Sequence, residues 1–160
     1  MELHKFDTER QVFFYEQDFY ALSNFSAFRV RWSGIEFDTS EAAYHWAKFD
    51  GAASHHPEIQ RLIMRARSAH CAFKIAEQYR ASRRTDWDAI KVDIMRSILL
   101  AKVGQHDYVR RKLLDTGDRE LIEDSWRDDF WGWGPNRDGQ NMIGKLWMEI
   151  RTELRDTKTA

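Results

Sequence analysis

The sequence lacks most of what would mark a secreted, membrane-bound or polyelectrolyte-binding protein. It contains one cysteine, Cys71, which excludes an internal disulfide framework and fits a reducing compartment. No segment approaches the ~18 consecutive apolar residues that span a bilayer, and the first residues lack the apolar stretch of a signal peptide. The 25 basic and 26 acidic residues nearly cancel, so no global charge attracts duplex DNA or a membrane. We therefore expect a cytoplasmic protein without membrane contact.

Standard metal and nucleotide motifs are also absent. There is no Cys-x-x-Cys, no His-Glu-x-x-His and no Gly-x-Ser-x-Gly, and the histidines do not recur at metal-ligand spacing. Gly132 and Gly134 are followed by Arg137 where a dinucleotide-binding loop has its third glycine. The sequence therefore predicts chemistry that uses neither a metal nor a cofactor.

The apolar pattern predicts an α+β fold that is mostly helical, with a small antiparallel sheet. A chain of 160 residues fits a single domain, with its core over about residues 11–155. Residues 28–37 alternate apolar and polar side chains around Ser33-Gly34, which predicts a β-hairpin. Strands are also expected over 12–15 and over 120–123, the latter returning to the hairpin.

The helices are expected where apolar residues recur at helical spacing. Asp38 and Thr85 are placed to cap two of them, and Gly104 to close the one that Thr85 begins. Their expected ranges are about 38–49, 57–66, 69–79, 85–104, 107–114 and 141–154.

Two tryptophans in one glycine-rich loop are the first candidates for ligand contact. The segment Phe130-Trp131-Gly132-Trp133-Gly134 cannot form a regular helix or a central strand. Trp131 and Trp133 offer flat faces on which a nucleobase could stack. The alternative is that both rings fill a small core, as large aromatic side chains usually do.

A row of polar side chains on the first helix is the second candidate. Glu41, Tyr44, His45 and Lys48 are spaced at i, i+3, i+4 and i+7, so they share one helix face. A carboxylate, a phenol, an imidazole and an amine in a row suit the wall of a cleft. The alternative is that Glu41 and Asp38 form a capping box at the helix start.

Two further segments could bind phosphate. Arg83 and Arg84 precede a helix whose first turn carries Trp87, and a guanidinium fork matches phosphate geometry, although a solvated face is the plainer interpretation. Asn141 opens the last helix with Lys145 one turn in, and unpaired amides at such a start can hold a phosphate.

Several of these segments, taken in order, resemble the NADAR (YbiA-like) family. The resemblance spans roughly Phe13 to Leu154, and each block alone is weak while the ordered set is specific. The blocks are Tyr20-Ala21-Leu22-Ser23-Asn24-Phe25, Thr39-Ser40-Glu41-Ala42-Ala43-Tyr44, Lys48-Phe49, Trp87, Asp128-Asp129-Phe130-Trp131-Gly132 and Asn141-Met142-Ile143-Gly144.

The resemblance implies N-glycosidase activity. Members of the family cleave early riboflavin-pathway intermediates, or remove ADP-ribose from guanine bases in nucleic acid, often beside an ADP-ribosylating toxin. We predict ADP-ribosylated guanine as substrate, and a partner toxin of this kind would then be expected. The Trp131/Trp133 pair offers more ring surface than one pyrimidine needs, and Arg83, Arg84 and Lys145 offer more positive charge than one monophosphate requires.

The resemblance also assigns residues. It makes Glu41 the catalytic glutamate and ties Asp128, Trp87 and Trp131 to activity. The further positions that it places in the pocket are Asn24, Lys48 and Asn141. One departure is Trp133, which replaces an acidic residue that some relatives carry.

The residues and the resemblance suggest the same chemistry. Cleavage of a ribosyl C–N bond passes through an oxocarbenium-like state, which needs a carboxylate, an aromatic clamp and groups that hold phosphate. Two alternatives from other classes stay open. One is a non-catalytic module that binds ADP-ribose or NAD, and the other is a helical protein-interaction domain.

Overall fold

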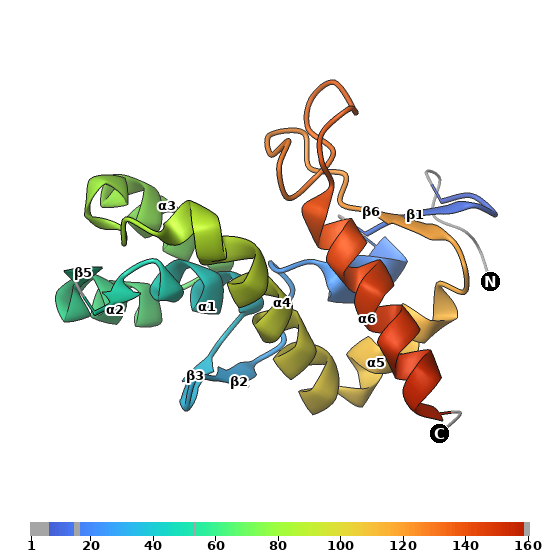
Figure 1. The fold of residues 1–160 in the computed structure, drawn as a ribbon, viewed down its shortest axis with the longest axis horizontal. Coiled ribbons are helices and arrows are strands. Elements are labelled where there is room, and N and C mark those ends of the chain that lie inside the picture. Colours follow the sequence, from blue (N-terminus) through green and yellow to red (C-terminus); the bar gives the residue numbers. More distant parts are fainter. Residues whose placement is uncertain (1–6, 15–16, 53, 159–160) are drawn as a thin grey trace. The chain divides into compact units, whose positions relative to one another are not determined.

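The computed structural model describes residues 7–14, 17–52 and 54–158, which form two compact units. The terminal unit comprises Met1–Ser23 and His106–Ala160, and the middle unit comprises Asn24–Gln105. Figure 1 shows the elements of both units along the chain. The two candidate regions are divided between the units: the polar row on the first helix belongs to the middle unit, and the tryptophan loop belongs to the terminal unit.

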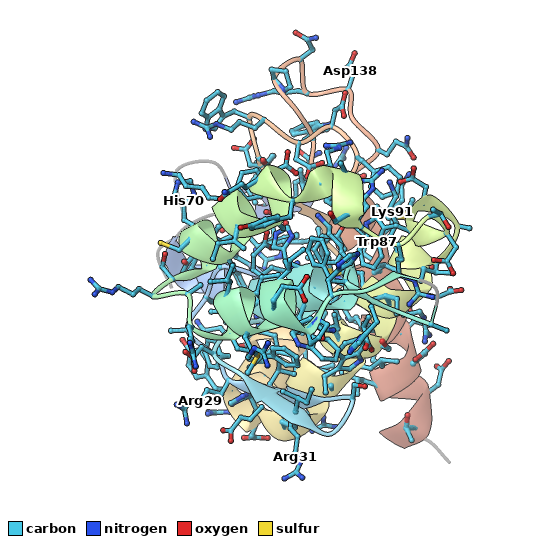
Figure 2. The ribbon with its side chains drawn as sticks, turned by 90° about the vertical axis from the view of Figure 1, so that its left-hand side faces the viewer. Arg29, Arg31, His70, Trp87, Lys91 and Asp138 are labelled. Carbon is cyan, nitrogen blue, oxygen red and sulfur yellow. The ribbon has the colours of Figure 1, made fainter. Side chains whose placement is uncertain are left out.

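The middle unit begins with the predicted hairpin. Strands β2 (Val30–Trp32) and β3 (Ile35–Phe37) pair antiparallel with Trp32 opposite Ile35. Ser33 and Gly34 both have positive φ, at 53° and 77°, as a tight two-residue hairpin turn requires. Arg29 and Arg31 extend outward from this hairpin (Figure 2), so its polar face is exposed as the alternation predicts.

Four helices and a short second hairpin complete the middle unit. The inward side chains of the first hairpin, Trp32 and Phe37, pack edge-on against Trp46 of α1. The helices are α1 (Ser40–Ala47), α2 (Pro57–Met64), α3 (Ala69–Gln78) and α4 (Trp87–Gln105), with the short turn η2 (Arg80–Ser82) between α3 and α4 and the strands β4 (Asp50–Gly51) and β5 (Ser54–His55) before α2. Gly104 lies inside α4, so the prediction that it closes the helix is wrong. The structure places the start of α4 two residues after Thr85.

The terminal unit pairs the two ends of the chain. Strand β1 (Gln11–Phe13) runs parallel to β6 (Glu120–Ile122), with Val12 opposite Leu121. The prediction that the late strand returns to the hairpin is therefore wrong: its partner is the first strand, and the three-residue ladder gives too weak a local pattern to reveal it. The last position of the predicted first strand, Tyr15, lies outside the described residues.

Three helices accompany this strand pair in the described part of the terminal unit. The 3₁₀ helix η1 (Gln17–Leu22) precedes the middle unit in the chain, and α5 (Asp107–Asp115) follows it. Helix α6 (Met142–Lys158) is the last element of the chain. Trp147 of α6 is fully buried and donates from Nε1 to the carbonyl oxygen of Leu22 at 2.9 Å. This bond fastens α6 to η1, and it satisfies the one polar atom of a buried indole.

The observed elements confirm the predicted fold class, which is α+β and mostly helical. The sheets β2–β3 and β4–β5 are antiparallel, each with two strands. Helix boundaries agree with the expected ranges to within a few residues. None of the described helices has the length and apolarity needed to cross a bilayer.

Candidate active site

The polar row lies on α1, which begins at a side-chain cap. Thr39 is the N-cap, and its hydroxyl oxygen accepts from the amide of Ala42 at 3.1 Å. The prediction that Asp38 caps this helix with Glu41 is therefore wrong. Thr39 occupies the cap position, and the Glu41 carboxylate turns along the helix instead of back to its start. The capping explanation for Glu41 no longer applies.

Glu41 and His45 form a tight buried pair on α1. Oε1 of Glu41 lies 2.6 Å from Nε2 of His45, and the two residues are 8% and 2% exposed. The spacing i, i+4 places them one turn apart on the same face, as the sequence predicts. A carboxylate held away from water interacts strongly with whatever charge develops beside it.

Lys48 lies one further turn along the same face and is also buried. Burial lowers the pKa of Lys48 from 10.5 to about 8, although the carboxylates of Glu41 and Glu77 oppose this shift. Its ammonium nitrogen is 5.0 Å from the centre of the Tyr44 ring and 5.9 Å from that of Trp87. Aromatic faces stabilise a cation that has lost its water. A buried lysine with a lowered pKa is suited to proton transfer or to attack on an electrophile.

Trp87 begins α4 and is buried in the middle unit. Its indole is 1% exposed and packs against Tyr44, with the ring centres 5.1 Å apart. Figure 2 labels Trp87 and Lys91, one turn apart on α4. The indole therefore contacts Tyr44 and lies near the Lys48 ammonium group, and its predicted contact with substrate stays a prediction.

The two predicted arginines differ in their surroundings. Arg83 is partly exposed and is held loosely by Asp88, with 3.5 Å between the charged atoms. Arg84 is bonded through two nitrogens to Asp86, at 2.6 and 2.9 Å, and through a third to the carbonyl of Asp50. Arg83 is thus the more available of the two for an incoming phosphate.

Three buried polar atoms of the middle unit have no hydrogen-bond partner among the described residues. They are Oδ1 of Asn24, Oγ of Ser40 and Nδ1 of His45. Asn24 lies next to α1, because its carbonyl oxygen accepts from the amide of Glu41 at 3.2 Å. Leaving a buried polar atom unpaired costs roughly 1–3 kcal/mol. Such atoms close to a buried carboxylate and lysine are typical of a site that completes its bonds with substrate or water.

In the terminal unit, Asp128 organises the tryptophan loop. Its Oδ1 accepts from the amides of Phe130 and Trp131, at 2.9 and 2.8 Å. This is an Asx-type turn, which fixes the backbone of the Phe130-Trp131 pair. The structure therefore gives Asp128 a positioning role, and its predicted catalytic role stays untested.

The two loop tryptophans are less open than the sequence suggests. Trp131 is 9% exposed and meets Phe130 edge-on, with 4.8 Å between ring centres. Trp133 is half-buried against Phe13, with 5.6 Å between ring centres, and Arg137 lies over its ring. Of the two rings, Trp133 has the greater exposed surface for stacking in this conformation.

The amides of residues 139–143, at the start of α6, are already paired. The amides of residues 139–143 donate to carbonyl oxygens of the loop, for example from Met142 to Phe130 at 3.0 Å and from Ile143 to Trp131 at 3.1 Å. The prediction that unpaired amides bind a phosphate here is wrong for these positions, because the loop folds back and pairs with them. Lys145, one turn in, is exposed.

Asn141 ties the start of α6 to strand β6. Its Oδ1 accepts from the amide of Glu123 at 2.9 Å, and its Nδ2 donates to the carbonyl of Leu121 at 2.8 Å. Both functional atoms of the side chain are thus used by backbone. Its backbone adopts a positive φ of 50°, which asparagine tolerates better than most residues. Contact between Asn141 and a substrate stays a prediction.

The sequence places His45 on the shared face of α1 but assigns catalysis and binding only to its neighbours. The signal was the i, i+4 spacing from Glu41, which the structure turns into a 2.6 Å contact. In the described parts of the chain, no group of three or more His, Cys, Asp or Glu side chains is arranged to hold a metal ion.

The chain is similar to known proteins over most of its length. The family described as NADAR domain matches residues 13–155. An N-glycosidase of Nostoc punctiforme is 36% identical over 147 residues, covering 91% of this chain and 93% of that protein. The N-glycosidase YbiA of Escherichia coli is 30% identical over 148 residues, covering 92% and 89% of the two chains.

Two further similarities concern a longer protein and a solved structure. A riboflavin biosynthesis protein of Vibrio vulnificus is 36% identical over 150 residues, but the chain spans only 40% of its length. The NMR structure of the E. coli protein YbiA matches with a TM-score of 0.82 and 30% identity, covering 96% of this chain and 89% of that one. These findings confirm the resemblance drawn from the sequence, and the relatives named N-glycosidases are hydrolases, as it implied.

Proposed function

Because the chain belongs to the NADAR domain family, we propose that it is an N-glycosidase that hydrolyses the bond between a ribose and a nitrogen atom. The observation that carries this proposal is the buried row on α1, where Glu41 pairs with His45 and Lys48 lies one turn away. Positive charge develops on the sugar as the C–N bond breaks, and a buried carboxylate stabilises it or activates the attacking water. Glu41 is the proposed carboxylate.

Lys48 supplies the second group of the proposed mechanism. With a pKa of about 8, a fraction of its amine is neutral at physiological pH. The charged form attracts an anionic substrate, and the neutral form accepts a proton. Tyr44 and Trp87 hold the amine in place through their ring faces.

The substrate is proposed to carry phosphate near the ribose. Arg83 is partly exposed and only loosely paired with Asp88, so a phosphate can compete for its guanidinium. Water would add to the ribose carbon, and the products would be the free base or amine and a phosphorylated ribose. The loop residues Asp128, Trp131 and Trp133 belong to the terminal unit, and their contact with a substrate stays a prediction.

ADP-ribosylated guanine, the substrate predicted from the sequence, remains one candidate. Two of its supports are weaker than the sequence suggested. Trp131 is buried, so the two open ring faces expected for a large base are reduced to the half-buried Trp133. Arg84 is taken by Asp86. A functional pairing with an ADP-ribosylating toxin would follow only if this candidate holds.

A ribosylamino-pyrimidine phosphate is the candidate that we rank first. The observation that favours it is the similarity to a Vibrio vulnificus protein named for riboflavin biosynthesis, at 36% identity. A monophosphate also needs fewer cations than a pyrophosphate, which agrees with a site where Arg83 is the more available arginine.

The test is to incubate the protein with each substrate in turn and measure released ribose 5-phosphate or ADP-ribose. Faster release from the pyrimidine phosphate, with a Glu41→Ala variant inactive, supports the proposal. Release of ADP-ribose from a modified oligonucleotide, with a shallow salt dependence, would instead select guanine. If wild-type protein binds these ligands and cleaves neither, the chain is a binding module and the proposal fails.

A further inference from the structure

The imidazole of His45 has no role in the function proposed above, although it makes the shortest contact with Glu41. Nε2 of His45 lies 2.6 Å from Oε1 of Glu41, and both residues are buried. A contact of this length between a ring nitrogen and a carboxylate is a strong, charge-assisted hydrogen bond. It occupies one carboxylate oxygen and leaves Oε2 outside the bond.

Two aromatic rings pack edge-on against this imidazole. The ring centre of Phe73 on α3 lies 5.8 Å away at 67°, and that of Tyr44 lies 5.2 Å away at 66°. Phe73 is itself stacked with His70 at 6.3 Å. The imidazole therefore has little freedom to rotate, and the direction of its N–H bond is set by packing.

The other ring nitrogen identifies the tautomer. Nδ1 of His45 is buried without a hydrogen-bond partner among the described residues. A proton on Nδ1 would be a buried donor without an acceptor, and it would leave the lone pair of Nε2 facing the carboxylate. A proton on Nε2 removes both conflicts, because it is donated to Glu41 and leaves only an unpaired acceptor. On the same face, the charged groups that act on Lys48 are Glu41, Glu77, Arg80 and Arg83.

We infer that His45 is a positioning residue that donates from Nε2 to Oε1 of Glu41 and so directs Oε2 toward the reacting ribose. This inference rests on the proposed role of Glu41. In this histidine–carboxylate pair, the carboxylate of Glu41 reacts and the imidazole of His45 orients it. A small error in carboxylate position slows the reaction strongly, because about 1 Å of misplacement can lower the rate roughly 10²-fold.

Two amide substitutions test the hydrogen bond directly. The amide nitrogen of Gln reaches about as far as Nε2 of histidine, whereas that of Asn reaches only as far as Nδ1. We expect His45→Gln to keep most of the turnover and His45→Asn to lower kcat by roughly 10²-fold, with KM little changed. Both variants lose the same ring packing against Phe73, so their melting temperatures should fall together. Equal turnover in the two variants would overturn the inference.

A double-mutant comparison asks whether His45 acts through Glu41. In a Glu41→Gln background, His45→Asn should reduce kcat no further, because residues that act as a unit are not additive. A full additional loss in the double variant would mean that His45 acts on its own, which would contradict a positioning role.

Proton NMR gives a measurement that does not depend on activity. A downfield, exchange-protected Nε2–H signal of His45 should be present in the wild type and absent in Glu41→Ala. Its absence from the wild type, or its persistence in the variant, would overturn the inference whatever the enzyme cleaves. If the signal behaves as expected and neither substrate is cleaved, the proposed function fails while the hydrogen bond stands.

Discussion

The row on α1 and the start of α6 are both buried and polar, but their hydrogen bonds differ in kind. At the start of α6, the amides of residues 139–143 are paired with the loop, and both side-chain atoms of Asn141 are bonded to backbone. On α1, His45 keeps an unpaired nitrogen and Lys48 is buried at a lowered pKa. Paired groups support the fold, whereas unpaired ones cost stability. We infer that the hydrogen bonds at the start of α6 stabilise the fold, whereas the α1 row serves chemistry.

The largest effect on stability should come from the core of the terminal unit. Trp147→Ala removes a fully buried indole and its bond to Leu22, so it should lower the free energy of unfolding by about 3–5 kcal/mol. Trp131→Ala should cost less, because its ring lies in the loop, and it should weaken ligand binding by about 1–3 kcal/mol if the ring stacks on substrate. Urea unfolding and ligand titration measure the two quantities. Equal destabilisation, with binding intact, would make Trp131 a core residue only.

The next largest effect on stability should come from Asn141, which ties the start of α6 to β6. Asn141→Ala leaves the amide of Glu123 and the carbonyl of Leu121 without their partner, and it places Ala at a positive φ. We expect a loss of about 2–4 kcal/mol in the free energy of unfolding. Asn141→Asp keeps the acceptor and should lose less. Activity per folded molecule should stay near wild type in Asn141→Asp, and a selective loss of turnover would show that Asn141 also serves the substrate.

A smaller effect, of opposite sign, is expected at Lys48. Its pKa is about 8 in the folded protein against an ordinary 10.5, so between these values the unfolded chain binds a proton that the folded chain does not. The free energy of unfolding should therefore rise with pH across this window, and the penalty is fully present below about pH 8. Lys48→Met should stabilise the protein at pH 7 by roughly 1–3 kcal/mol while abolishing activity.

The control for this change is Lys145→Met, at an exposed lysine on α6. It should leave the free energy of unfolding within about 0.5 kcal/mol of the wild type at every pH, as surface substitutions usually do. The measurement is urea unfolding at pH 7 and pH 10. If Lys48→Met is destabilised at pH 7, or if its advantage does not shrink at pH 10, the burial penalty has been misjudged.

Features that depend on local spacing could be predicted from the sequence, and those that depend on distant contacts could not. The hairpin and the α1 row follow from local spacing: alternation around Ser33-Gly34 sets the register, and i, i+4 places Glu41 beside His45. The pairing of β1 with β6 and the loop contacts at the start of α6 join segments far apart in the chain. Three-residue strands and glycine-rich loops carry little local pattern, so tertiary contacts decide their partners. The sequence likewise leaves open whether the Trp131 ring faces a ligand or the core, and the structure buries the ring.

The most direct test of the central claim is to measure kcat and the free energy of unfolding for Glu41→Gln on one preparation. The substitution keeps the shape of the side chain and removes its charge. If the α1 row is there for chemistry, kcat should fall by about 10²-fold or more, the scale of a positioned acid or base. The free energy of unfolding should change by no more than about 1.5 kcal/mol, because the amide oxygen of Gln can still accept from Nε2 of His45. A variant that unfolds more readily than the wild type yet keeps its specific activity would contradict the account and make Glu41 a structural residue.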